Sequence, residues 1–154
     1  MLAGLSALIL LSEAAPVATA PGRGVFACEL GGKRLWLTAE GEDLTYHYGA
    51  PDREELTIVG RPGAGNLHYR LRDETIDGGR FIAASIRFTN RGYEYIVNYD
   101  IQSRPPFPRT AHILVLKGDN TLKVESCLAF SVERSAYDFS QVPSEMPKFY
   151  SEIH

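Results

Sequence analysis

The chain has two cysteines, Cys28 and Cys127, and almost all of its strand-like sequence lies between them. In an exported protein such a pair predicts one intramolecular disulfide, because exported compartments are oxidising. In the chain-entropy model, closing a loop of about 100 residues stabilises a fold by roughly 4.7 kcal/mol. The pair therefore predicts a domain whose first and last strand regions are joined covalently.

An apolar leader precedes the first cysteine. Residues 2–11 are apolar or small throughout, about the length of a signal-peptide hydrophobic region and too short to span a bilayer. Small residues follow, and residues 18–20 have the A-x-A pattern of a cleavage site. We interpret residues 1–20 as a signal peptide and expect a periplasmic or secreted bacterial protein. Cleavage after Ala14 or Ala18 is an alternative, and a buried N-terminal helix is the alternative to a leader.

Other uses of the cysteines have weaker support in the sequence. Residues 25–28 loosely resemble a lipobox, but Phe26 fits that pattern poorly and Cys28 lies far beyond the apolar run, so lipid anchoring at Cys28 is disfavoured. Two buried free thiols are the alternative if the leader interpretation is wrong. Two cysteines without C-x-x-C spacing or clustered histidines cannot complete a zinc site, so we expect no metal and no cofactor.

The sequence between the cysteines is typical of successive β-hairpins. Apolar and aromatic residues alternate with polar ones in several short runs, the period of a half-buried strand. Asn90-Arg91-Gly92 and Gly118-Asp119-Asn120 are hairpin turns between such runs. The expected strands are 33–38, 44–48, 56–59, 67–72, 80–89, 93–101, 111–117 and 121–130.

These strands predict an all-β fold with one domain over residues 21–130. We expect a small antiparallel β-barrel of about eight strands in hairpin order, closed where the disulfide joins its ends, with a β-sandwich as the alternative. Residues 131–154 form an irregular C-terminal tail. Its aromatic residues favour packing on the domain, whereas its serine, glutamate and proline content is typical of a disordered tail.

Composition and motifs exclude several functions. The formal net charge is -3 and no long basic run occurs, so nucleic acid is not an expected partner. No second apolar stretch follows the leader, and we expect no membrane span. The chain lacks G-x-S-x-G and H-E-x-x-H, its histidines are dispersed, and its acidic residues fall in turn-like sequence. We therefore expect a non-enzymatic monomer.

Loops are then the expected carriers of function. Residues 103–109 form a proline-dense loop in which Phe107 stands between prolines and is flanked by Arg104 and Arg109. A stiff loop loses little entropy on docking, and arginine with an aromatic residue is the usual composition of an interface anchor. We predict that Arg104, Phe107 and Arg109 bind a protein partner. The alternative is a small ligand in a cavity lined by strand tyrosines, namely Tyr46, Tyr48, Tyr69, Tyr93, Tyr95 and Tyr99.

The arrangement of these features resembles small exported bacterial β-proteins. The resemblance covers roughly residues 26–128 and is carried by Cys28, Gly31-Gly32-Lys33, residues 44–49 and 55–58, the 88–99 hairpin and the strand ending at Cys127. The layout also resembles the bacterial lysozyme-inhibitor families. That resemblance implies a disulfide-bonded barrel of the cell envelope that inhibits a hydrolase by inserting a loop into its cleft. The segment after Cys127 departs from the layout, since such inhibitors tend to end near the last cysteine.

Overall fold

The computed structural model describes residues 22–144, which form an all-β fold and confirm the predicted fold class. The predicted signal peptide and residues 145–154 of the tail lie outside this range. The strands are β1 (Arg23–Glu29), β2 (Arg34–Glu40), β3 (Asp43–Ala50), β4 (Arg53–Gly60), β5 (Leu67–Ile76), β6 (Gly79–Asn90), β7 (Tyr93–Gln102), β8 (Arg109–Lys117), β9 (Asn120–Ser126) and β10 (Ala129–Val132). Three short 3₁₀ helices are η1 (Pro62–Ala64), η2 (Arg134–Ala136) and η3 (Phe139–Gln141).

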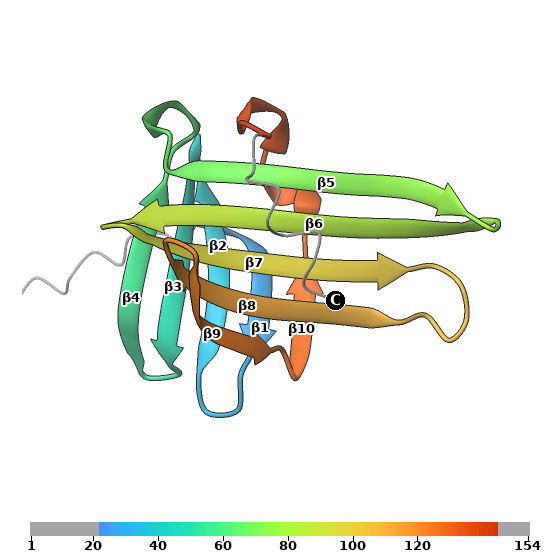
Figure 1. The fold of residues 1–154 in the computed structure, drawn as a ribbon, viewed down its shortest axis with the longest axis horizontal. Coiled ribbons are helices and arrows are strands. Elements are labelled where there is room, and N and C mark those ends of the chain that lie inside the picture. Colours follow the sequence, from blue (N-terminus) through green and yellow to red (C-terminus); the bar gives the residue numbers. More distant parts are fainter. Residues whose placement is uncertain (1–21, 145–154) are drawn as a thin grey trace, which may run out of the picture.

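The strands form two antiparallel sheets rather than a closed barrel. Sheet A has the order β10-β1-β2-β3-β4 and sheet B the order β5-β6-β7-β8-β9. The strands of sheet B run across those of sheet A rather than alongside them (Figure 1). The antiparallel hairpin order was predicted correctly within each sheet, although the structure has ten strands rather than about eight. The barrel was wrong and the sandwich alternative describes the fold, because no ladder joins β4 to β5 or β9 to β10 within residues 22–144.

The chain passes from one sheet to the other at two places, after β4 and after β9, and at each place it stops pairing with a neighbouring strand. After β4, η1 turns the chain, and Gly60 lies so close to sheet B that a Cβ there would be 2.9 Å from Phe88 Cε1. After β9, Cys127 and Leu128 form the second crossing. Since each crossing redirects the chain, the strands before and after it cannot pair edge to edge.

The disulfide Cys28–Cys127 is present, with Cα atoms 5.4 Å apart. Two details of the prediction were wrong: Cys28 lies inside the first strand rather than before it, and Cys127 lies between two strands rather than in the last one. β1 was missed because a bulge between Gly24 and Phe26 places Val25 and Phe26 both in the core, which breaks the period of two.

Two of the hairpin turns depend on a glycine with positive φ. Arg91 and Gly92 both have positive φ and join β6 to β7 through a two-residue loop, as in a type I′ turn. Asp77 and Gly78 make the same connection between β5 and β6. Tight loops of this kind fix the strand register, so the side chains that face the core are also fixed.

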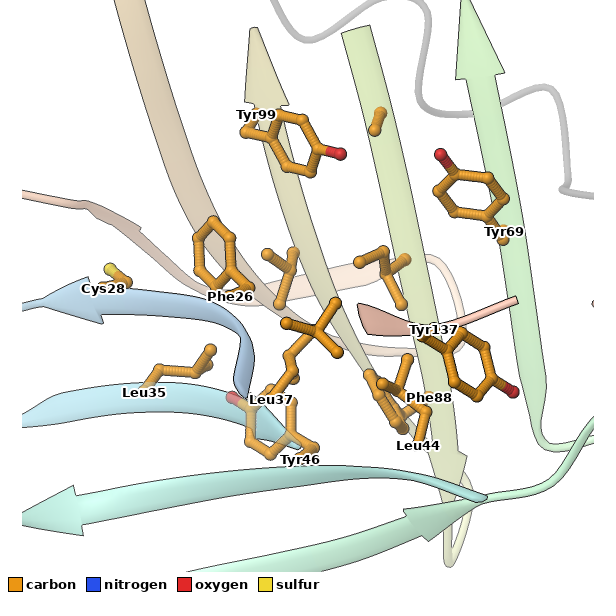
Figure 2. Packing of buried hydrophobic residues seen from close by; sticks show 14 of the residues in the cluster. Phe26, Cys28, Leu35, Leu37, Leu44, Tyr46, Tyr69, Phe88, Tyr99 and Tyr137 are labelled. Atoms are coloured by element: carbon orange, nitrogen blue, oxygen red, sulfur yellow. The ribbon is translucent and has the colours of Figure 1, made fainter. Parts of the chain in front are cut away.

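The space between the sheets is filled by side chains (Figure 2). Tyr46 and Phe88 pack with ring centroids 5.5 Å apart, and Phe26 stacks on Tyr99 at 6.0 Å. Each of these pairs joins sheet A to sheet B. Tyr46, Tyr99 and Phe88 are also among the largest fully buried side chains, so the interior is a packed core.

Candidate functional site

A groove lies between the β5–β6 hairpin and the residues that follow β10. Tyr69 and Leu71 of β5 and Arg80 and Ile82 of β6 form one side, and side chains from residues 133–140 form the other. The groove has a volume of about 670 Å³. Small-molecule sites in proteins have volumes of roughly 300–1,000 Å³ and combine apolar walls with a few polar groups. We refer to this site as the groove.

The floor of the groove exists because sheet B is longer than the sheet that covers it. Figure 1 shows β5 and β6 running well past the strands of sheet A. Along β5, Tyr69 is buried, whereas every residue from Arg70 to Ile76 is exposed. Leu71 points to the same side as Tyr69 but is 38% exposed. The apolar floor is therefore an extension of the core face beyond the edge of sheet A.

The facing wall is held on the domain by aromatic contacts. Phe139 stacks on Tyr69 with ring centroids 4.1 Å apart and meets Tyr137 edge-on at 4.9 Å. The Tyr137 hydroxyl donates to the backbone carbonyl of Glu42 at 2.8 Å, and Tyr69 N–H donates to the Pro143 carbonyl at 3.0 Å. These contacts cover part of the free edge of β5 and fix the width of the groove.

One arginine of the groove already has an anionic partner. Arg80 donates to both carboxylate oxygens of Asp73, from Nε at 2.8 Å and from a terminal nitrogen at 2.6 Å. This hydrogen bonding lowers the pKa of the Asp73 carboxyl. The ion pair of Arg80 and Asp73 is close to neutral as a unit.

The second arginine, Arg134, has no such partner. It is the first residue of η2 and is partly buried. Within residues 22–144, no carboxylate oxygen lies within 4.0 Å of its guanidinium. Its charge acts on the hydroxyls of Tyr69 and Tyr99, which point toward one another over β6 (Figure 2). Burial raises the pKa of both hydroxyls, so they stay protonated and able to donate.

The predicted loop residues lie beside the groove but not in its lining. Phe107 is 58% exposed at the tip of the β7–β8 loop. The Arg109 guanidinium lies 4.8 Å from the Phe130 ring, and the Arg104 side chain covers Gly79. Two hydrogen bonds join this loop to β6. Ser103 N–H donates to the Arg80 carbonyl at 2.9 Å, and Arg80 N–H donates to the Ser103 hydroxyl oxygen at 2.7 Å. The three side chains thus share one end of sheet B without converging on a common point.

Sequence reasoning missed the groove because half of it comes from the tail. Tyr137 and Phe139 are the residues that could have indicated the groove, since two aromatic residues in a polar tail favour packing of the tail on the domain. Of the tyrosines proposed to line a cavity, Tyr69 lines the groove, whereas Tyr46 and Tyr99 are core residues.

A second polar network lies on the outer face of sheet A. His47 contacts the Glu54 carboxylate through Nδ1 at 2.5 Å and the Thr38 hydroxyl through Nε2 at 2.8 Å. The His47 side chain is only 17% exposed, because its ring stacks on Trp36 with centroids 5.0 Å apart.

This hydroxyl–imidazole–carboxylate order resembles that of a catalytic triad. Thr38, however, lies in β2, a strand paired on both sides, so the peptide N–H groups beside it belong to the sheet ladders. The described residues provide no backbone donors aimed at an oxyanion there. We therefore treat the network as a structural one.

The acidic turns hold ion pairs. Glu55 binds Lys33 and Arg53, and Glu74 binds Arg72. Among residues 22–144 no three His, Cys, Asp or Glu side chains are grouped so that they could hold a metal ion. The same residues contain no helix that is long and apolar enough to cross a membrane.

Together, the fold and the groove define a disulfide-bonded β-sandwich with an open groove at one end. Comparisons with protein-family models, curated proteins and solved structures found no match for the chain.

Proposed function

We propose that the protein is a non-enzymatic binding protein that holds a small amphipathic ligand in the groove. The observation that carries this proposal is the groove itself, with an apolar floor, an aromatic wall and arginine side chains in about 670 Å³. The packed core supports a site outside the sandwich interior. A ligand in the groove would cover Leu71, which is an exposed extension of the core face.

A neutral amphiphile tests this proposal without involving charge. We expect decanamide, titrated into the purified disulfide-bonded protein, to shift the methyl resonances of Leu71 and Ile82. Leu71→Glu should weaken binding at least about tenfold, because the apolar chain of the ligand would bury a carboxylate. Ile76→Glu is the matched control, since Ile76 is 44% exposed on the same strand and does not line the groove. Equal loss in both variants, or no methyl shifts, would contradict the proposal.

A second candidate function is inhibition of a hydrolase through the loop at residues 103–109. The exposure of Phe107 favours it, because the loop around Phe107 is held by hydrogen bonds from Gln102 N–H to the Pro108 carbonyl and from Phe107 N–H to the Arg104 carbonyl. A fixed loop with an exposed aromatic residue suits insertion into a cleft. In this candidate the protein also acts as a monomer without catalysis.

Lysozyme lysis assays test the second candidate. We expect the protein to slow lysis by a chicken-, goose- or invertebrate-type lysozyme, and Phe107→Ala to abolish the effect. Full lysozyme activity at large molar excess of the protein, for all three types, excludes this candidate.

We also propose that the protein is exported to the periplasm or secreted. The disulfide supports this location, because such bonds persist in oxidising compartments. Cell fractionation followed by intact-mass measurement is the test. A protein found in the cytoplasm with free thiols and an intact N-terminus would contradict it.

A further inference from the structure

We infer that the ligand of the groove carries a carboxylate, which Arg134 binds together with the hydroxyl of Tyr69. This inference rests on the proposed function and names the chemical class of the ligand: a small monocarboxylate with an aliphatic or aromatic body. Three independent features of the groove point to it.

The first feature is the charge balance of the groove. Arg80 is neutralised by Asp73 through two hydrogen bonds, and the Glu133 carboxylate accepts a hydrogen bond from the Ser135 hydroxyl. Glu133 is an exposed carboxylate of the lining, and the charge of Arg134 lowers the pKa of the Asp73 carboxyl held by Arg80. Arg134 is nevertheless the arginine of the lining that has no carboxylate oxygen within 4.0 Å among residues 22–144. An anionic head group would pair with this guanidinium without breaking an existing ion pair.

The second feature is the geometry of a guanidinium group. Arginine presents planar paired N–H donors that match the two oxygens of a carboxylate, and such bidentate pairs are stronger than neutral hydrogen bonds. Arg134 is partly buried, so water screens its charge less than at a fully exposed position. A carboxylate seated there also stays within reach of the apolar floor formed by Leu71 and Ile82.

The third feature is the pair of tyrosine hydroxyls. The hydroxyls of Tyr69 and Tyr99 are hydrogen-bonded to one another. One O–H proton serves that bond, so when Tyr99 donates to Tyr69, the Tyr69 O–H is available to a ligand. Figure 2 shows the two hydroxyls facing one another across β6. Tyr69 itself lines the groove. Because the charge of Arg134 also acts on the Tyr69 hydroxyl, a carboxylate bound at Arg134 would have a neutral second donor nearby.

A matched pair of ligands separates this inference from the proposed function. Decanoate and decanamide share an alkyl chain and differ in charge at the head group. We expect decanoate to bind the wild-type protein about 10- to 100-fold more tightly than decanamide, which is the usual range for a hydrogen bond to a charged group. Decane-1-sulfonate should bind more weakly than decanoate, because its three tetrahedrally arranged oxygens match the planar guanidinium less well.

Variants at three positions assign the effect to named side chains. Arg134→Met should remove the preference for decanoate, and Arg134→Lys should restore part of it. Tyr69→Phe should reduce the preference, because a hydroxyl binds a carboxylate more strongly than the carbonyl of decanamide. Arg70→Met is the control, since Arg70 is exposed on the same strand as Tyr69 and does not line the groove. Calorimetry gives the affinities, and denaturant unfolding verifies that each variant is folded.

The outcomes are distinguishable. Equal affinities for decanoate and decanamide, with groove methyl shifts for both, would overturn the carboxylate inference and leave the binding proposal intact. A preference for decanoate that survives in Arg134→Met would also overturn it. Absence of groove shifts with either ligand would overturn both.

Discussion

Cys28 and Cys127 are bonded at the point where the chain passes from sheet B back to sheet A. Cys28 lies in β1 of sheet A, and Cys127 directly follows β9 of sheet B. Two backbone hydrogen bonds hold the same crossing: Cys127 N–H donates to the Ala111 carbonyl, and Leu128 N–H donates to the Glu29 carbonyl. The disulfide therefore joins the two sheets at a corner where no strand ladder joins them.

Reduction of this bond should destabilise the protein strongly. The two cysteines are 99 residues apart, and in the chain-entropy model a loop of this size contributes about 4 to 5 kcal/mol. Urea unfolding of the oxidised protein and of the same protein in reductant measures the difference. The Cys28→Ala/Cys127→Ala double variant serves as a control, since reductant should not change its stability. Identical midpoints for oxidised and reduced wild-type protein would contradict the assigned role of the bond.

Gly49 should not tolerate a side chain. It lies at a bulge between β3 and β4, where a Cβ atom would be 2.3 Å from the Arg53 carbonyl oxygen. We expect Gly49→Ala to cost about 1–3 kcal/mol, because the β4 backbone would have to move. Gly24→Ala should change stability by less than about 0.5 kcal/mol, since no atom lies within 4 Å of a Cβ there. Equal effects in thermal unfolding would contradict this account of the bulge.

The hydroxyl of Tyr137 should contribute measurably to the attachment of the groove wall. It donates to the Glu42 carbonyl in the β2–β3 turn, so Tyr137→Phe should cost about 1 kcal/mol. Tyr93→Phe is the matched control, because the Tyr93 hydroxyl makes no hydrogen bond in the described part of the chain. This variant should lose little stability. Denaturant unfolding compares the two, and a larger loss for Tyr93→Phe would refute the prediction.

The stability of the protein should fall at alkaline pH because of its buried tyrosines. Burial raises the pKa of Tyr46 and Tyr99 above the ordinary value of 10.0, and raises that of Tyr137 to about 12. The folded protein therefore keeps protons that the unfolded chain loses as the pH rises above 10. These groups contribute their full stability below pH 10, and that contribution is lost as the pH rises toward 12 and beyond.

An absorbance titration of tyrosinate, recorded together with far-ultraviolet circular dichroism, tests this pH dependence. We expect part of the tyrosine absorbance to change only as the fold is lost. Titration of every tyrosine near pH 10 with the fold intact would contradict the assigned burial.

The sequence predicts the strands well where the pattern is regular. In β7 the apolar and aromatic residues at positions 93, 95, 97, 99 and 101 occupy alternate positions, and the turn before them was predicted as Asn90-Arg91-Gly92. The pattern fails at β1, because the bulge places Val25 and Phe26 on the same side of the sheet. Local periodicity cannot reveal such a bulge, since the extra residue is recognised only by its partners on β2.

The difference between barrel and sandwich, and the groove itself, depend on contacts between distant residues. Whether the sheets close into a barrel is decided at the two connections between them. At the first, Gly60 approaches Phe88, and at the second, Cys127 follows β9. The groove requires Phe139 to stack on Tyr69, seventy positions earlier in the chain. No local pattern encodes either relationship. Of the predicted loop, residues 103–108 lie between β7 and β8 and Arg109 begins β8, and its role in binding stays a prediction.

The most direct measurement of the central claim is the set of intermolecular nuclear Overhauser effects between bound decanoate and the protein. The account predicts contacts from the alkyl chain to the methyl groups of Leu71 and Ile82 and to the ring of Phe139, with the carboxylate end nearest Arg134. Contacts confined to other surfaces, such as the exposed Leu122 and Val124 of β9, or no contacts at all, would contradict it.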